Sequence, residues 1–213
     1  MPKTKEQNDL IKDERRKQIL ATALKSFCCI GFDATKIDDI AKQAGISHGL
    51  LYHYFTTKEE MFFELFFHSR GMYRKFETKI LTDETLDPLQ KIRKLLTGLL
   101  QKMDTDEDFC LLMYFILNAN LIKRDFDKEI LKLCETNHMF LPLKPSMKAS
   151  LKEVLLEGQR NGSLSETDVA QMETVFWVIV HGIAVNKMLC IRHNHPFRMP
   201  DGDLFLKLFL KEN

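Results

Sequence analysis

Residues 35–58 have the sequence TKIDDIAKQAGISHGLLYHYFTTK. Apolar residues recur at helical spacing in the first half of this stretch, Gly45 interrupts them, and Ser47 opens a second helical segment. A tight turn between two short helices needs a residue that tolerates a positive φ, which Gly45 supplies, and a small residue such as Ala41 lets the helices approach closely. With Leu51 packing the second helix onto the first, the stretch predicts a helix-turn-helix unit.

The second of these helices carries more polar and aromatic groups than a core needs. With Leu51 turned inward, it presents His48, Gly49, Tyr52 and His53 to the outside. A helix that enters the major groove reads base edges with groups of this kind, so we assign base contacts to His48 and Gly49, and contacts with phosphates or thymine methyls to Tyr52 and His53. For Gly49 the alternative is that the missing side chain only eases helix packing.

Several other residues of this region are candidates for contact with the DNA backbone. Helix N-termini direct free N–H groups and a positive dipole at an anion, so Thr35, Ser47 and Lys58, each at the start of a helix, are predicted phosphate ligands. For Thr35, which also resembles the first residue of a capping box, and for Ser47, capping alone is the alternative, and the two roles are compatible. Tyr54 either contacts DNA like Tyr52 or packs in a half-buried position.

Composition predicts an all-α protein. The 213 residues contain few alternating Val, Ile and Thr runs and no Asn-Gly or Asp-Gly hairpin turn. The formal net charge is only +1, but residues 1–58 hold 10 Lys and Arg against 7 Asp and Glu, whereas the remainder holds 21 against 23. The basic excess therefore lies with the helix-turn-helix, and its small size predicts few, well-placed phosphate contacts.

The pattern divides the chain into two domains. Residues 1–60 are predicted to form a three-helix DNA-binding domain, with a polar arm up to Asp13 and a first helix over 14–29. Residues 61–213 are predicted to form a helical bundle for ligand binding and dimerisation, and a long helix over 58–81 connects the two. The later helices are expected, after the Asp87-Pro88 start signal, at 88–103, 106–121, 125–140, 146–160, 166–192 and 203–210. The last two are expected to form the dimer contact, because 166–192 is apolar on more than one side.

Other function classes find little support. No phosphate-binding loop, dinucleotide fingerprint, nucleophile elbow or paired metal motif is present, so we expect neither an enzyme nor a cofactor. The start of the chain is polar, and the longest apolar stretch, 175–184, contains His181 and is about half the span of a bilayer, which predicts a cytoplasmic protein. Five scattered cysteines fit buried thiols in a reducing compartment, although Cys28 and Cys29 could alternatively sense thiol oxidation.

A possible metal site lies near the end of the chain. Cys190, His193 and His195 fall within the short sequence CIRHNH, and soft ligands so close together can bind Zn or Cu. No fourth ligand is evident, so a solvated loop without metal is the preferred interpretation.

The sequence GFDATKIDDIAKQAGISHGLLYHYFTTKEEM at residues 31–61 resembles the TetR family of bacterial transcriptional regulators. The glycine, the threonine and the groups IA, AGIS, GLLY, YF and KE stand in the order typical of that family. The resemblance covers about the first third of the chain. It implies a homodimer that binds a palindromic DNA operator through two helix-turn-helix heads, with C-terminal helices that bind an inducer and each other. Lys36 departs from the family, which often has a second threonine there, and is predicted either to contact a phosphate or merely to replace a cap.

These observations predict a TetR-like repressor that a small apolar or amphipathic inducer releases from double-stranded DNA. The alternatives are a helical ligand-binding or interaction protein that does not bind DNA, and a regulator that responds to metal or thiol oxidation. Helical spacing does not distinguish a ligand cavity from a filled core, so the C-terminal residues yield only candidates. The candidate lining residues are Phe109, Met113, Tyr114, Phe115, Phe140, Met172, Phe176 and Trp177, with Asn118, Asn120, His138 or His181 as polar contacts.

Overall fold

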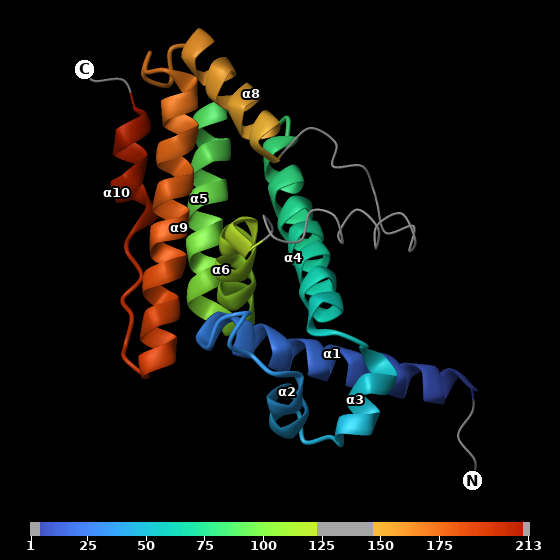
Figure 1. The fold of residues 1–213 in the computed structure, drawn as a ribbon. Helices are drawn as coiled ribbons and strands as arrows, with labels where there is room; N and C mark the ends of the chain where they lie inside the picture. The colour runs from blue at the N-terminus through green and yellow to red at the C-terminus, as the bar shows by residue number, and fades with distance from the viewer. Residues whose placement is uncertain (1–4, 123–146, 211–213) are drawn as a thin grey trace.

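The computed structural model describes residues 5–122 and 147–210, and within these ranges it contains helices and no strand, as the composition predicted. Figure 1 shows the arrangement. The helices are α1 (Lys5–Cys29), α2 (Ile37–Gln43), α3 (His48–Tyr54), α4 (Lys58–Leu81), α5 (Pro88–Thr105), α6 (Glu107–Ile122), α8 (Met147–Arg160), α9 (Val169–His193) and α10 (Gly202–Leu206), followed by a 3₁₀ turn (Lys207–Phe209).

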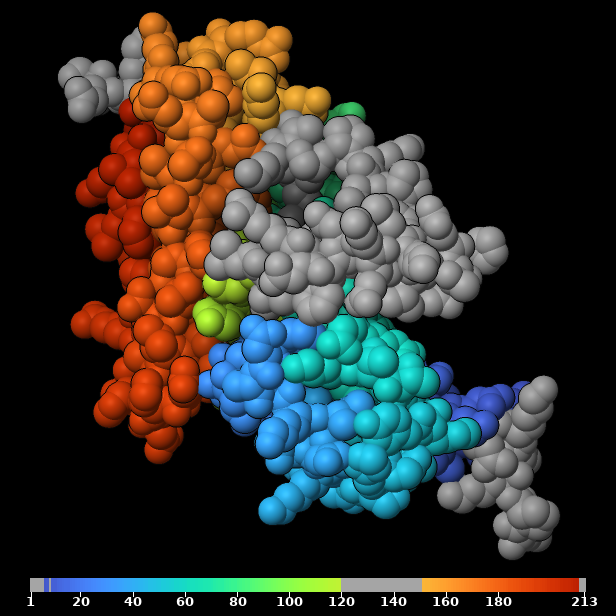
Figure 2. Space-filling model, viewed as in Figure 1, coloured from blue at the N-terminus to red at the C-terminus, as the bar shows by residue number. Residues whose placement is uncertain are grey.

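The helices form a small end and a bundle. α2 and α3 lie under α1 at one end of the molecule, α4 leads away from them, and α10 runs beside α9 along the bundle (Figure 1). In the space-filling view, α2 and α3 make up the surface of the small end (Figure 2). A continuous core joins both parts: the ring of Phe27 in α1 stacks on Phe115 in α6 at 6.5 Å, and Phe62 in α4 meets Phe115 at 4.9 Å. The predicted domain division after residue 60 falls inside α4.

Side-chain caps set the starts of α3, α4 and α5 where the sequence predicted them. The Ser47 hydroxyl accepts a hydrogen bond from the Leu50 amide at the start of α3, and Thr57 does the same for Glu60 at the start of α4. Asp87 and Gln90 form a reciprocal capping box at the start of α5. Gly45 has φ of +65°, as the turn requires.

The predicted N-terminal arm is wrong from Lys5 onward, because α1 begins there and not at Glu14. The additional turns are polar, and their apolar residues Leu10 and Ile11 are exposed. They extend beyond the other helices (Figure 1), so no buried face imposed an apolar period on the sequence.

Other boundaries shift by a few residues. α9 begins at Val169 because Asp168 caps it by accepting a hydrogen bond from the Ala170 amide. The final helix is shorter than predicted and ends in the 3₁₀ turn. The helix predicted over 125–140 lies outside the described residues.

α9 is also the one described helix that is long and apolar enough to cross a membrane by length and composition. Only 33% of its most apolar window is buried within the described structure. Its apolar residues therefore leave a substantial surface open, and a core helix of a soluble protein meets the same length and composition test.

Candidate nucleic-acid interface

α2, the turn and α3 form the predicted helix-turn-helix. Ile40 and Ala41 of α2 and Leu51 of α3 are buried against one another and against α1. The turn is closed by a hydrogen bond of 3.1 Å from the Ile46 amide to the Ala41 carbonyl. Because its apolar face is packed inward, α3 has a fixed orientation and turns its other face to the outside.

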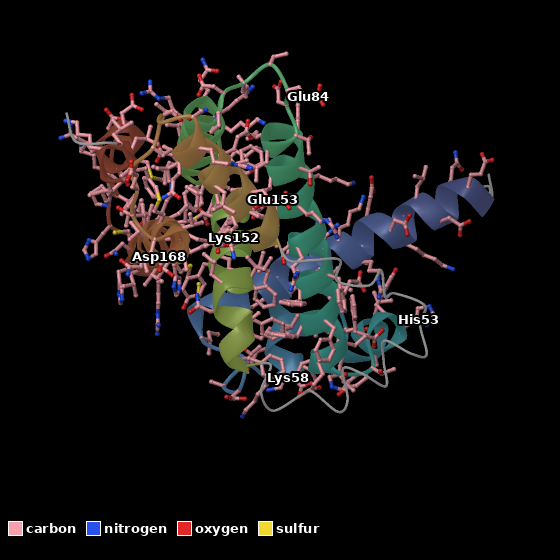
Figure 3. All side chains as sticks on the ribbon, turned by 90° about the horizontal axis from the view of Figure 1, so that it is seen from above. His53, Lys58, Glu84, Lys152, Glu153 and Asp168 are labelled. Carbon is pink, nitrogen blue, oxygen red and sulfur yellow. The ribbon has the colours of Figure 1, made fainter. Side chains whose placement is uncertain are left out.

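That outer face includes the four residues predicted to read DNA, His48, Gly49, Tyr52 and His53, all of which are exposed, and Leu50 is exposed beside them. Tyr52 is 41% exposed although its ring is large and apolar. Figure 3 labels His53 on α3. A Cβ atom at Gly49 would meet no atom within 4 Å, so helix packing does not require glycine there. This observation favours the interpretation of Gly49 as a site of close approach to a ligand.

Asp38 of α2 also belongs to this surface. Its Oδ1 lies 2.5 Å from His48 Nε2, and the His48 ring lies 4.5 Å from that of Tyr52. The imidazole is therefore held between a carboxylate and an aromatic ring, and its Nδ1 atom is left for another partner. No local pattern predicts this pair, because the two residues lie on different helices.

Tyr54 lies at the end of α3 in the half-buried position that its alternative interpretation described. Its ring meets that of His53 at 5.7 Å, and its carbonyl oxygen accepts a hydrogen bond of 2.9 Å from Arg16. The residue joins the exposed face of α3 to the interior.

Thr35 does not play the predicted role. The N-cap residue of α2 is Lys36, which makes no side-chain cap, so the predicted capping box is wrong. Thr35 is only 2% exposed, and its hydroxyl donates a hydrogen bond of 2.6 Å to the Gly31 carbonyl. The side chain therefore ties the loop to the end of α1 and has no surface to offer a phosphate. Lys36 itself is exposed and Ser47 lies at the open start of α3.

Lys58 has partners within the fold. Its ammonium group donates hydrogen bonds to the carbonyl oxygens of Phe32, Asp33 and Thr35 at 2.9, 3.3 and 3.3 Å, and lies 4.5 Å from the centre of the Phe32 ring. An ammonium group has three donors, and all three are occupied. In this arrangement Lys58 holds the loop before α2 to the start of α4, and its contact with a phosphate stays a prediction.

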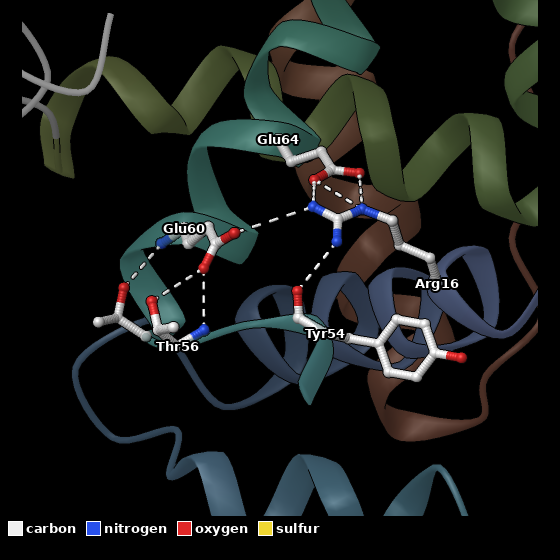
Figure 4. A network of polar contacts seen from close by, with 6 residues as sticks. Arg16, Tyr54, Thr56, Glu60 and Glu64 are labelled. Carbon is white, nitrogen blue, oxygen red and sulfur yellow. Dashed lines mark hydrogen bonds and ion pairs between the residues drawn. The ribbon is translucent and has the colours of Figure 1, made fainter. Parts of the chain in front are cut away.

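Arg16 of α1 links α3 to α4, as Figure 4 shows. Its guanidinium donates to both carboxylate oxygens of Glu64 and to the Tyr54 carbonyl, and lies 4.2 Å from the centre of the Phe55 ring. Glu60 lies 3.9 Å from the same guanidinium and accepts hydrogen bonds from Thr56. These contacts across three helices have no local signature in the sequence.

The cysteine and histidine candidates do not come together. Among the described residues, no group of three His, Cys, Asp or Glu side chains is placed to hold a metal ion, and the His193 and His195 rings are 6.4 Å apart. The Cys28 thiol is buried and donates to the Leu111 carbonyl, and burial raises its pKa far above the usual range. Burial also raises the pKa of Cys110 to about 11. Neither thiol is therefore prone to ionise and react.

The residues predicted to line a C-terminal ligand site differ in how deeply they are buried. Asn118 donates to the Tyr114 carbonyl within α6, and Trp177 and His181 are half-buried on α9. Phe140 and His138, and the side chain of Asn120, lie outside the described part. The candidates that are fully buried in the core are Phe109, Met113, Phe115, Met172 and Phe176.

Two cavities adjoin the small end. A pocket of about 370 Å³ lies between α1, α4 and α6 and is lined among others by Arg16, Leu24 and Glu64. A second, of about 210 Å³, includes Tyr114 and Asn118 in its lining. Both open to solvent next to α1, so neither is enclosed by the bundle.

Comparison with known proteins gives a consistent result. Residues 19–65 match the family described as bacterial regulatory proteins, tetR family. The chain is 32% identical over 105 residues to the HTH-type transcriptional regulator AcrR of Shigella flexneri, a match that covers 49% of each chain. The matched region thus spans about half the length of this relative.

The likeness of the fold extends much further along the chain. The structure of the ketosteroid transcriptional regulator KstR2 of Mycobacterium tuberculosis superposes with a TM-score of 0.63 at 23% identity, covering 93% of this chain and 96% of that one. That of HlyIIR, a hemolysin II transcriptional regulator, gives 0.63 at 20% identity, with coverage of 94% and 99%. At these identities the likeness concerns the fold alone.

Proposed function

We propose that the chain is a DNA-binding transcriptional regulator of the TetR family of bacterial regulatory proteins, the family that residues 19–65 match. The observation that carries the proposal is the outer face of α3, where exposed His48, Tyr52 and His53 surround a glycine that nothing in the fold requires. These groups supply hydrogen bonds, apolar contacts and a place where DNA can approach the backbone.

The proposal includes a cytoplasmic homodimer on a palindromic operator. Two copies related by a two-fold axis place two α3 helices in successive major grooves, about 34 Å apart, and this spacing makes binding sensitive to small movements of the heads. A repressor that a small molecule releases is the form we favour, since α4 connects the heads to the bundle in which such a molecule would bind. Relatives named as repressors, such as KstR2 of Mycobacterium tuberculosis, support this choice.

A fluorescence-anisotropy titration of the full chain with DNA from upstream of its own gene tests the proposal. Tyr52→Ala should lower affinity for that DNA at least tenfold without changing the thermal midpoint of unfolding, because the ring contacts little of the fold. Lys36→Ala should lower the slope of log affinity against log salt by about one unit. Lys152→Ala, which removes an exposed charge on α8 (Figure 3), is the matched control and should change neither.

The alternative, a helical protein that binds ligands but not DNA, gives a different result. In that case the upstream DNA would bind no more tightly than unrelated DNA of equal length, and Tyr52→Ala would leave both affinities unchanged.

A further inference from the structure

Four buried polar atoms on α4 and α9 have no hydrogen-bond partner in the described structure. They are the Tyr73 hydroxyl, Glu77 Oε1, Trp177 Nε1 and His181 Nε2. Tyr73 is 1% exposed and Glu77 2% exposed. An unpaired polar atom in the interior costs about 1 to 3 kcal/mol, so native proteins leave few of them. Four in one region indicate a place that is completed by a group outside the described residues.

Two of these side chains are in contact across the helices, Tyr73 of α4 and Trp177 of α9. Tyr73 and Glu77 are four residues apart on α4, and Trp177 and His181 are four apart on α9, so each pair lies on one side of its helix. The ring centres of Tyr73 and Trp177 are 5.7 Å apart and tilted by 57°. Trp177 also meets Phe176 edge to face, which helps to fix the position of the indole. We call Tyr73, Glu77, Trp177 and His181 the α4–α9 cluster.

Two carboxyl groups, Glu77 and Glu173, lie at the cluster, and Arg74 is a cation that acts on Glu77. Burial, with a smaller contribution from Glu173 one turn before Trp177 on α9, raises the pKa of Glu77 to about 8. Arg74 lowers the pKa of Glu77 and acts on it more strongly than Glu173 does, but its side chain is exposed on α4. An anion in the cluster would meet two carboxyl groups. A cation would instead stabilise the Glu77 carboxylate that burial disfavours.

The aromatic rings favour the same kind of ligand. A cation within about 6 Å of a ring centre is attracted by the negative face of the ring, most strongly by tryptophan, and the attraction increases where water is excluded. Tyr73 and Trp177 supply two such rings beside the carboxyl group. The hydroxyl, the indole N–H and the imidazole can hydrogen-bond a polar part of the same molecule.

We propose that the α4–α9 cluster binds an organic cation, with Glu77 paired to its positive group and the rings of Tyr73 and Trp177 lying against it. This inference deepens the proposed function, since such a ligand would be the inducer. The cluster shares α4 with Glu60 and Glu64, which contact Arg16 and thus the end of α3. A ligand that moves α4 relative to α9 therefore acts on the helix that joins it to the DNA-binding head.

Trp177 provides a direct measurement, because it is the only tryptophan in the chain. Titration of the full chain, without DNA, should give saturable changes in its fluorescence with tetraphenylphosphonium, but none with tetraphenylborate, which has the same shape and the opposite charge. A smaller pair, benzyltrimethylammonium and its neutral isostere 2,2-dimethylpropylbenzene, should differ at least tenfold in affinity in favour of the cation. Equal affinity within both pairs, or no saturable change with either cation, would overturn the proposal.

A pair of variants identifies the carboxyl group. Glu77→Gln keeps the size of the side chain and removes its charge, so it should lower cation affinity at least tenfold and leave the affinity for the neutral isostere unchanged. Glu84→Gln, on the exposed connection after α4 (Figure 3), makes the same change away from the cluster and should have no effect. Unchanged cation affinity in Glu77→Gln would contradict the assignment. Since the titration contains no DNA, its outcome is separate from that of the operator experiment.

Discussion

At Gly49, folding and DNA binding place opposite demands on one residue. Glycine inside a helix costs about 1 kcal/mol relative to alanine, and a Cβ at Gly49 would touch nothing. Gly49→Ala should therefore raise the free energy of unfolding by up to about 1 kcal/mol, while operator affinity falls at least tenfold because the methyl group holds the backbone away from the DNA. Urea unfolding and fluorescence anisotropy measure the two effects.

Gly71 offers the matched control. It is an exposed glycine inside α4 that also has open space at its Cβ. Gly71→Ala should give a similar stabilisation with unchanged operator affinity. If Gly49→Ala behaved in the same way, Gly49 would have no role in DNA contact.

Lys58 is expected to contribute to stability more than to DNA affinity. Lys58→Met keeps most of the side-chain volume but leaves three carbonyl groups without their shared donor. Loss of hydrogen bonds to a charged group should lower the free energy of unfolding by about 1 to 3 kcal/mol. The salt slope of DNA binding should stay constant, whereas Lys36→Met should reduce it by about one unit. A reduced slope in Lys58→Met at unchanged stability would support the phosphate assignment.

The buried Glu77 carboxyl makes the free energy of unfolding decrease as pH rises. Its pKa is about 8 in the folded chain and near 4.5 when exposed, so between these values the folded state holds a proton that the unfolded state has lost. Stability therefore falls as pH rises from about 4.5 to 8. Glu77→Gln removes this loss, and should match the wild type near pH 4.5 and exceed it by on the order of a few kcal/mol at pH 8. Urea midpoints across this range measure the difference; a constant difference at all pH values would contradict the buried, protonated carboxyl.

At the scale of helices, the sequence predicted elements whose signals are local. Ser47, Thr57 and Asp87 cap helices through atoms three residues away, and Gly45 sets the turn by its own backbone, so each could be recognised in the chain. The outer face of α3 could be predicted in the same way. Once the buried positions of the helix are assigned from their spacing, the residues left over are those of the outer face.

Features that depend on contacts between helices could not be predicted. Thr35 resembles a cap, but its hydroxyl reaches back to Gly31, and Lys58 resembles a free cation until the loop before α2 folds against it. The first turns of α1 have no buried face to mark them. The α4–α9 cluster combines residues about 100 positions apart in the sequence. Only Trp177 and His181 were predicted as possible ligand contacts, and no residue of α4 was predicted to lie beside them.

The link between α3 and α4 through Arg16 leads to a prediction at this scale. Arg16→Met and Glu64→Gln should each lower the free energy of unfolding by about 1 to 2 kcal/mol, and the double variant should lose less than the sum, because both remove the same pair. Arg15→Met is the control, since the Arg15 guanidinium only reaches Gln18 on the same exposed helix. Strict additivity of the two losses would show that the pair does not couple α1 to α4.

An apolar stripe on α9 is left uncovered by the described part of the chain. Val175, Val178 and Leu189 on α9 are exposed, and Gly182 between them has open space at its Cβ. Leu204 and Leu208 beside α9 extend the same kind of surface. Positions 175, 178, 182 and 189 repeat at spacings of three, four and seven, which is the pattern of a helix that packs against another helix. If a second copy packs its own stripe against this one across a two-fold axis, the apolar stripes of both copies become buried.

A charge in the middle of this stripe separates dimerisation from folding. Val178→Glu should convert a dimer to a monomer in size-exclusion chromatography with light scattering, since burying two carboxylates near a two-fold axis is strongly unfavourable. The helical circular dichroism should be preserved, because Val178 is 64% exposed within one chain. Affinity for a palindromic operator should fall at least a hundredfold, to that of a single head. Leu156→Glu, at an exposed leucine on α8, should leave the dimer and its operator affinity intact. A dimer that survives Val178→Glu would place the two-fold contact elsewhere, and the spacing of the two α3 helices would then have to be set by another face of the bundle.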